Sequence, residues 1–178
     1  MRIISGKNKG KKLIEFKGRD IRPTSDRAKE SLFNILSDMV LDCDFLDLCS
    51  GTGAIGLEAY SRGANSVTFV DNDKESIKLT QKNANSIGLD KEFCLSDAVS
   101  FVKRTNKTFD IIFFDPPYAF EGIKDVLVEV KNRKLLNDGG IFVYEHKSDL
   151  ESINVLGFEL YDSRKYGIAV FDFYKESL

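Results

Sequence analysis

The chain has 178 residues, of which 42% are hydrophobic and 30% charged, with a formal net charge of −2. This length fits one domain with a sizeable core, and no apolar run approaches the roughly 20 residues that a membrane-spanning helix needs. Three cysteines without CxxC spacing and a single histidine exclude the usual zinc ligand sets. We therefore expect residues 1–178 to form one cytoplasmic domain of mature sequence, without a signal peptide and without a metal site.

Basic residues are concentrated at the N-terminal end. Residues 1–30 contain ten Lys or Arg against four Asp or Glu, whereas residues 31–178 contain sixteen against twenty-four. This distribution is typical of a phosphate-binding surface, although charge alone fits a solvated basic tail equally well. The candidate nucleic-acid contacts are Arg2, Lys7, Lys9, Lys11, Lys12, Arg22 and Arg27.

The first 24 residues have the pattern of a small hairpin extension. Residues 1–5 and 11–16 indicate two short strands, and the Asn-Lys-Gly sequence at 8–10 indicates the turn between them. The core domain would then occupy residues 25–178.

Beyond this extension, short apolar runs alternate with helical patterns. The expected strands are 45–48, 67–70, 93–95, 111–114 and 141–144. The expected helices are 28–39, 55–62, 74–87, 98–105 and 123–130. Such an alternation is typical of an α/β fold with a mostly parallel sheet and helices on both faces. The closing runs, 158–164 and 168–174, leave no room for a crossover helix and predict an antiparallel hairpin at the sheet edge.

A glycine-rich turn follows the first expected strand of the core. Gly51, Gly53 and Gly56 let the backbone turn sharply, and the helix that starts there offers free N–H groups to a ligand. A dinucleotide would place its pyrophosphate close to the acidic Asp47, which would repel it. The sulfonium and amino groups of S-adenosylmethionine would instead be attracted to Asp47, so the sequence favours S-adenosylmethionine over NAD.

Two further carboxylates follow neighbouring strands at the same expected edge. Asp71 ends the second strand of the core, where it can accept hydrogen bonds from ribose hydroxyls. Asp97 follows the third strand and can accept a hydrogen bond from an adenine amino group, although a helix N-cap is an equally good interpretation. Together with Asp47, Gly51 and Gly53, these are the candidate cofactor residues.

The sequence Asp115-Pro116-Pro117-Tyr118 lies at the carboxyl end of a buried strand, where open α/β sheets bind ligands. The two prolines fix the loop and leave carbonyls that can only accept hydrogen bonds. An aromatic exocyclic amine is a poor nucleophile, because its lone pair is delocalised into the ring. If Asp115 and the Pro116 carbonyl each accept one N–H, the lone pair is directed toward a methyl donor, and Tyr118 can stack on the base. These four residues are the candidate catalytic residues.

Two other chemistries are disfavoured. Methylation of cytosine at C5 would need a nucleophilic cysteine beside a proline, and Cys43, Cys49 and Cys94 all lack that neighbour. A lone histidine, His146, is more often structural than catalytic, so it has no part in this mechanism.

The sequence resembles the bacterial 16S ribosomal RNA guanine-N2 methyltransferases, which have the class I S-adenosylmethionine-dependent fold with a seven-stranded sheet. The resemblance covers nearly the whole chain. Its motifs are MRIISG at 1–6 with GKKL at 10–13, RPTSDR at 22–27 with ESLF at 30–33, the glycine turn, the loop 115–118, and Tyr166-Gly167. The Asp-Pro-Pro-Tyr sequence alone also resembles DNA adenine-N6 methyltransferases, whereas the N-terminal motifs point to the ribosomal RNA family.

The resemblance implies a substrate and a set of contacts. The cofactor would lie on Asp47, Gly51, Gly53, Asp71 and Asp97, and the target base on residues 115–118. Arg22, Thr24 and Arg27 would contact RNA phosphate or the cofactor carboxylate, or else cap and anchor the first helix. The expected partner is 16S rRNA within a partly assembled small ribosomal subunit. The alternatives are a DNA adenine-N6 methyltransferase, a non-enzymatic RNA-binding module and, more remotely, a dehydrogenase.

Overall fold

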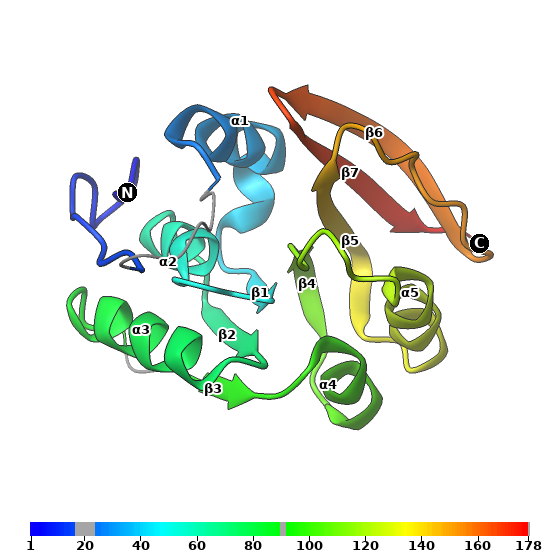
Figure 1. Cartoon of the computed structure of the whole chain (residues 1–178), viewed down its shortest axis with the longest axis horizontal. Helices are drawn as coiled ribbons and strands as arrows, with labels where there is room; N and C mark the ends of the chain where they lie inside the picture. The colour runs from blue at the N-terminus through cyan, green and yellow to red at the C-terminus, as the bar shows by residue number, and fades with distance from the viewer. Residues whose placement is uncertain (17–23, 90–91, 178) are drawn as a thin grey trace.

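A computed structural model of the chain describes residues 1–16, 24–89 and 92–177. Its centre is a seven-stranded sheet with the order β3-β2-β1-β4-β5-β7-β6 (Figure 1). The strands are β1 (Asp44–Leu48), β2 (Ser66–Asp71), β3 (Glu92–Leu95), β4 (Phe109–Phe114), β5 (Leu136–Lys147), β6 (Phe158–Tyr166) and β7 (Ala169–Glu176). The first five are parallel to one another, and β7 pairs antiparallel with both β5 and β6. The predicted α/β class and the C-terminal antiparallel hairpin are confirmed.

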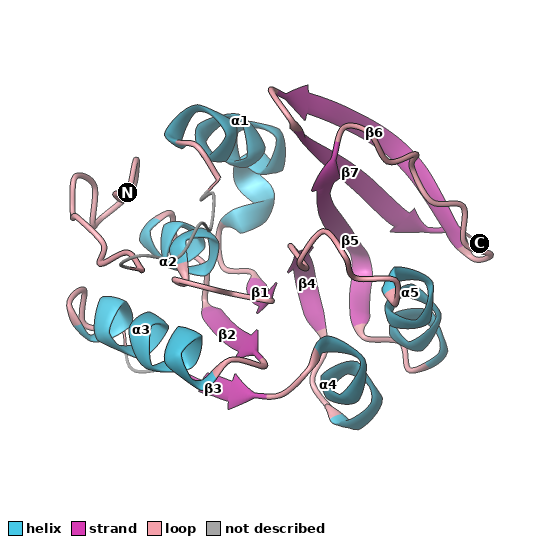
Figure 2. Ribbon diagram, in the orientation of Figure 1, coloured by secondary structure: helices cyan, strands magenta, loops and turns pink. Residues whose placement is uncertain are grey.

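Helices cover both faces of this sheet (Figure 2). They are α1 (Asp26–Leu36), followed by a short 3-10 helix (Ser37–Val40), then α2 (Ala54–Ser61), α3 (Lys74–Asn85), α4 (Ala98–Arg104) and α5 (Ile123–Asn132). One core cluster joins α1, α2 and α3 to the sheet, and a second joins α4 and α5 to its other face. Among the described residues, none of these helices has the length and apolar character to cross a membrane.

The central strand β4 is buried along almost its whole length. Alternate side chains of residues 111–114 enter opposite core clusters: Ile111 and Phe113 pack toward α1 and α2, whereas Ile112 and Phe114 pack toward α4 and α5. This burial on both faces explains why the run is continuously apolar. Because β4 is a central strand, the loop that follows it starts in the middle of the carboxyl edge of the sheet.

Two elements, the first helix and strand β5, differ from the sequence-based predictions by three residues or more at an end. The first helix ends at Leu36, because Ser37 adopts a positive φ of 44° and the chain continues as a 3-10 turn. Strand β5 begins at Leu136, five residues earlier than predicted, because Leu136 pairs with Phe109 across an irregularity in the ladder.

The predicted N-terminal hairpin is present, with shorter strand pairing than predicted. Residues 1–5 and 11–16 share one antiparallel bridge, between Arg2 and Lys12, and backbone hydrogen bonds from Ile3 to Lys11 and from Leu13 to Met1. The pairing does not extend further, because the backbone N–H groups of Ile4 and Ser5 donate to a side chain of α2.

Candidate active site

A cavity lies at the carboxyl ends of β1 and β4. Its wall comes mainly from the residues after β1 and from the end of β4. The N-terminal segment and the residue that lies just before the cap of α1 complete the wall. The lining residues are Met1, Phe16, Thr24, Asp47, Cys49, Ser50, Gly51, Thr52, Ala54, Ile55, Phe113 and Asp115. The cavity therefore brings together the glycine turn, the first residue of the Asp-Pro-Pro-Tyr loop and the N-terminal motifs.

The glycine turn after β1 is fixed by two backbone hydrogen bonds to the neighbouring strand, β2. The backbone N–H groups of Cys49 and Ser50 both donate to the Val70 carbonyl, at 2.8 and 2.9 Å. Gly51 has a φ of 55°, and no heavy atom lies within 4 Å of the position that a Cβ would take there. The wall therefore leaves space at Gly51 for a ligand to approach the backbone.

One buried polar atom of the cavity wall has no partner. Within the described part of the chain, the Ser50 hydroxyl is buried and makes no hydrogen bond. Such a group costs free energy unless a ligand or water satisfies it. This observation fits a polar cofactor seated against residues 50–52.

Asp47 is buried beneath the turn. Its Oδ2 accepts the Gly56 N–H at 2.9 Å, which fixes the start of α2 against β1. Removal from solvent raises the pKa of this carboxyl to about 8, against the lowering effect of that hydrogen bond. A cationic ligand in the cavity would favour the ionised form of Asp47, as the sequence predicted for a sulfonium cofactor.

The other candidate cofactor residues lie around the turn and outside the cavity wall. Asp71 accepts the backbone N–H of Gly51 at 2.8 Å through Oδ2 and that of Asp73 at 2.9 Å through Oδ1, and burial raises its pKa. Gly53, with a φ of 78°, packs so closely on Thr80 that a Cβ would overlap its methyl group. Asp97 is exposed and caps α4 by accepting the Ser100 N–H, a contact that lowers its pKa.

The Asp-Pro-Pro-Tyr loop is joined directly to the end of β1. The Asp115 N–H donates to the Leu48 carbonyl at 3.2 Å, and the Phe120 N–H donates to the Pro117 carbonyl at 2.8 Å, which closes the loop as a turn. Pro116 is buried, whereas Tyr118 is 50% exposed, with the Lys147 ammonium 5.2 Å from the centre of its ring. The loop thus places a carboxyl inside the cavity and an aromatic ring at the surface beside it.

Three carboxyl groups follow one another across the sheet on the face covered by α1. Asp47 on β1 is in register with Phe113 on β4, and Phe113 is in register with Val143 on β5. Because side chains alternate along a strand, Asp115 and Glu145, each two residues farther along, project on this same face. Burial and the nearby carboxyls of Glu145 and Asp47 together raise the pKa of Asp115 well above its ordinary value.

Glu145 was not identified from the sequence. It is only 7% exposed, and its Oε2 accepts a hydrogen bond of 3.0 Å from the Thr24 hydroxyl. Burial raises its pKa to about 7, although the Thr24 hydrogen bond acts in the opposite direction. The available signal was a carboxylate immediately after the apolar run 141–144, on the strand beside the Asp-Pro-Pro-Tyr strand.

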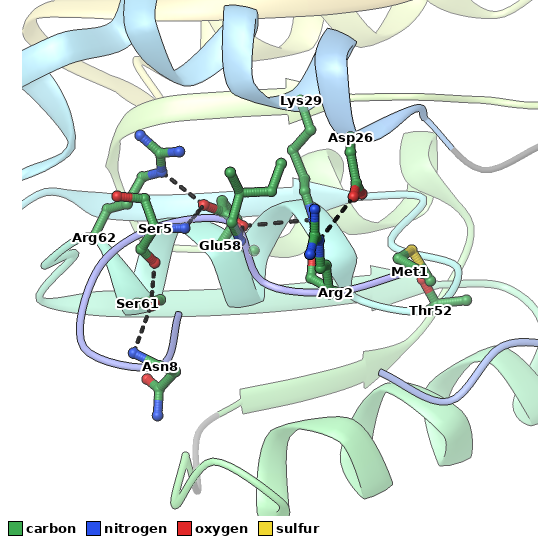
Figure 3. A network of polar contacts seen from close by, with 12 residues as sticks. Met1, Arg2, Ser5, Asn8, Asp26, Lys29, Thr52, Glu58, Ser61 and Arg62 are labelled. Carbon is green, nitrogen blue, oxygen red and sulfur yellow. Dashed lines mark hydrogen bonds and ion pairs between the residues drawn. The ribbon is translucent and has the colours of Figure 1, made fainter. Parts of the chain in front are cut away.

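The N-terminal segment is docked on α2 through the buried carboxyl of Glu58 (Figure 3). Glu58 accepts the backbone N–H groups of Ile4 and Ser5 at 2.8 and 3.0 Å. It also pairs with the Arg62 guanidinium at 2.8 Å and with the Lys29 ammonium at 3.5 Å. Residues 1–16 are therefore packed against the core domain by buried polar contacts, which excludes a freely solvated tail.

A second attachment comes from α3. The buried Asn83 side chain accepts the Ile14 N–H at 2.7 Å and donates to the carbonyls of Ile14 and Thr52, at 3.1 and 3.0 Å. One amide group therefore holds both the N-terminal segment and the glycine turn.

The candidate nucleic-acid contacts lie mostly on this docked segment. Arg2, Lys7, Lys9, Lys11, Lys12 and Arg27 are all exposed or partly exposed. Arg2 pairs with Asp26 at 3.1 Å, and the Lys7 ammonium lies 3.4 Å from the centre of the Tyr60 ring. The Arg22 prediction falls outside the described residues.

His146 is held within the protein and does not enter the cavity wall. Its ring nitrogens form hydrogen bonds with Asp172 at 3.0 Å and with the Lys147 carbonyl at 2.8 Å, and the ring stacks on Tyr144. Over residues 1–16, 24–89 and 92–177, no three His, Cys, Asp or Glu side chains are grouped so that they could hold a metal ion.

Comparisons with known proteins agree with this geometry. A sequence model of the family described as "Conserved hypothetical protein 95" matches residues 1–175. The chain is 34% identical over 183 residues to the YlbH protein of Bacillus subtilis, with 99% of each chain covered. It is 36% identical over 141 residues to the Ribosomal RNA small subunit methyltransferase D of Escherichia coli, a match that covers 79% of this chain and 68% of that one.

Comparison with solved structures shows that proteins of similar sequence share this fold. The yhhF protein of Escherichia coli superposes with a TM-score of 0.88 at 29% identity, over 99% of this chain and 97% of that one. A hypothetical protein of Thermus thermophilus superposes with a TM-score of 0.82, also at 29% identity, over 97% and 98% of the two chains. The chain therefore belongs to the conserved hypothetical protein 95 family and is similar along most of its length to ribosomal RNA small subunit methyltransferases D.

Proposed function

We propose that this protein transfers a methyl group from S-adenosylmethionine to the exocyclic N2 amine of a guanine in 16S ribosomal RNA. The observation that carries this proposal is the shared cavity, which is lined by both Gly51 of the glycine turn and Asp115 of the Asp-Pro-Pro-Tyr loop. The family and the names of its small-subunit rRNA methyltransferase relatives support the substrate.

The cofactor would occupy the part of the cavity between the glycine turn and Asp47. When bound, S-adenosylmethionine would supply an electrophilic methyl group on a sulfonium. Gly51 and Gly53 would give the backbone room, Asp47 would attract its positive charge, and Asp71 and Asp97 would hold its nucleoside. The unpartnered Ser50 hydroxyl supports a polar ligand in this position.

The Asp-Pro-Pro-Tyr loop would prepare the amine for attack. The Asp115 carboxylate and the Pro116 carbonyl each accept one N–H, so the lone pair of N2 is directed out of the ring plane toward the methyl donor. Asp115 then takes up the proton that the amine loses, and its raised pKa favours that step. Tyr118, which is half exposed, stacks on the base, and Pro117 keeps the loop rigid.

The docked N-terminal segment would form the RNA-binding surface beside this cavity. Its exposed lysines would contact phosphate groups, and the exposed Arg27 on α1 would extend that surface. Arg22, which lies outside the described residues, is a further proposed contact. The substrate is 16S rRNA within an assembling small subunit, and the protein would therefore act in the cytoplasm.

A methyl-transfer assay with labelled S-adenosylmethionine tests this proposal. The acceptors are small subunits from cells that lack the modification, naked 16S rRNA, and DNA. We expect label in the small subunits, recovered on digestion as N2-methylguanosine, and none after an Asp115→Ala substitution. Label in DNA together with unlabelled ribosomal acceptors would refute the proposed substrate.

A further inference from the structure

The buried Glu145 has no part in the chemistry proposed above, yet it lies next to the reacting centre. Asp115 follows the last residue of β4 and Glu145 lies in β5, each one position beyond the register pair of Phe114 with Tyr144, and neighbouring strands are about 4.8 Å apart. Two carboxyl groups at about this separation could each accept a hydrogen bond from neighbouring donors on one edge of a purine base.

The pair is energetically unfavourable unless it has a ligand. Both side chains carry acidic groups in a poorly solvated place, and each raises the cost of ionising the other. Among the described residues no lysine or arginine forms an ion pair with Glu145 or Asp115. A buried carboxyl with a raised pKa beside a candidate catalytic residue is itself a candidate for ligand binding.

The Thr24 hydrogen bond orients this carboxyl. The Thr24 hydroxyl donates to Oε2 of Glu145 at 3.0 Å, and Thr24 itself lines the cavity that contains Asp115. With Oε2 accepting from Thr24, Oε1 keeps its acceptor capacity for a second donor.

The edges of the two candidate bases differ at this position. In guanine the N2 amine is adjacent to the N1–H group, which is a donor. In adenine the N6 amine is adjacent to N1, which is an acceptor and would find no hydrogen on the ionised form of Glu145. A second carboxyl beside the amine site therefore favours guanine and opposes adenine.

We propose that Glu145 is a specificity-determining residue that accepts the N1–H of the target guanine while Asp115 and the Pro116 carbonyl hold its N2 amine. This inference rests on the proposed function, because it identifies how the same site recognises its base. Thr24 acts as a positioning residue for Glu145.

The test is a Glu145→Gln substitution, which preserves the size of the side chain and an acceptor for Thr24 but adds an N–H donor. Single-turnover methyl transfer is measured on small subunits with the mapped target guanine and on small subunits in which that nucleotide is adenine. The matched control is Glu151→Gln, the same chemical change at an exposed position near the end of β5. Cofactor affinity by calorimetry and thermal unfolding are recorded for each variant.

We expect Glu145→Gln to lower the rate on guanine by about 10-fold to 100-fold, the usual effect of losing a charged hydrogen bond. The guanine-to-adenine rate ratio should fall by at least about 10-fold, because the new amide can donate to adenine N1. Cofactor affinity should stay within about twofold, and Glu151→Gln should behave as the unsubstituted protein.

A second variant separates positioning from folding. Thr24→Val removes the hydroxyl and should lower the guanine-to-adenine ratio in the same direction, whereas Thr24→Ser, which restores a hydroxyl, should recover it. Equal losses on guanine and adenine, or an unchanged ratio in both Glu145→Gln and Thr24→Val, would overturn the inference. If the unsubstituted protein methylates no guanine in small subunits, the proposed function itself fails, which is a different result.

Discussion

A Cβ atom at Gly6 would overlap the carbonyl oxygen of Ser61, so the N-terminal segment can lie on α2 only because residue 6 has no side chain. The Ser61 carbonyl also accepts the Lys7 N–H at 2.8 Å, and the Ser61 hydroxyl donates to the Ser5 carbonyl at 2.6 Å. This close approach aligns the segment that carries the exposed residues Arg2, Lys7, Lys9, Lys11 and Lys12.

Gly6→Ala should therefore detach the segment. Both Gly6 and Gly10 have positive φ values, 82° and 84°, but a Cβ at Gly10 would have no heavy atom within 4 Å. We expect Gly10→Ala to cost about 1 kcal/mol from backbone strain alone, and Gly6→Ala to cost roughly 2–4 kcal/mol because overlap is added. Urea unfolding measures the difference, and equal losses in the two variants would show that the contact with Ser61 does not matter.

Asp47 should make stability depend on pH. Its folded pKa is raised to about 8, so the folded state holds this proton more tightly than the unfolded state does. The stabilisation is fully present below the ordinary Asp pKa of about 4 and is lost as the pH rises through about 8. Between about pH 5 and pH 8, the free energy of unfolding of the unsubstituted protein should therefore fall relative to that of Asp47→Asn. A constant difference across this range would contradict a buried, protonated Asp47.

Asp115→Ala should separate methyl transfer from cofactor binding. The carboxyl is proposed to contact the amine, so its loss should lower the transfer rate by at least about 100-fold. Cofactor affinity, measured by calorimetry, should change by less than about twofold. Asp149→Ala is the control, an exposed carboxylate near the same edge of the sheet. A large loss of cofactor affinity in Asp115→Ala would show that this carboxyl belongs to the cofactor site.

The basic N-terminal segment should determine the salt dependence of RNA binding. Each phosphate contact contributes about 0.7–0.9 to the slope of log affinity against log salt concentration. Replacing Lys9, Lys11 and Lys12 by Gln should weaken binding and lower the slope by up to about 2–3. The control is the same replacement at three exposed lysines elsewhere on the surface, namely Lys103, Lys124 and Lys134. An unchanged slope would exclude these residues from the RNA-binding surface.

The elements from Asp44 onward could be predicted because the apolar residues of each helix or strand recur at the spacing typical of that kind of element. Strand β4 is continuously apolar from Ile111 to Phe114, since both of its faces are covered there, and α5 repeats its apolar residues at helical spacing. The glycine turn and the Asp-Pro-Pro-Tyr loop could be placed on the same sheet edge for the same reason, because parallel strands end together.

The contacts of Glu58, Asn83 and Glu145 could not be predicted in this way. Their hydrogen bonds to Ile4, Ile14 and Thr24 join residues 54, 69 and 121 positions apart. No local pattern indicates such pairings, which depend on how α1, α2 and α3 pack. The N-terminal hairpin could be predicted, but not the shortness of its pairing, because the N–H groups of Ile4 and Ser5 donate to the distant side chain of Glu58.

The double attachment made by Asn83 has a thermodynamic consequence. Since one buried amide bonds to Ile14 and to the carbonyl of Thr52, the segment cannot move away from α3 without loosening the turn that lines the cavity. A ligand that immobilises either side lowers the cost of ordering the other, and this coupling must be equal in both directions. Nucleic acid bound to the segment and a methyl donor bound at the turn would then be expected to bind with positive cooperativity, with Asn83 as one of the links between the two.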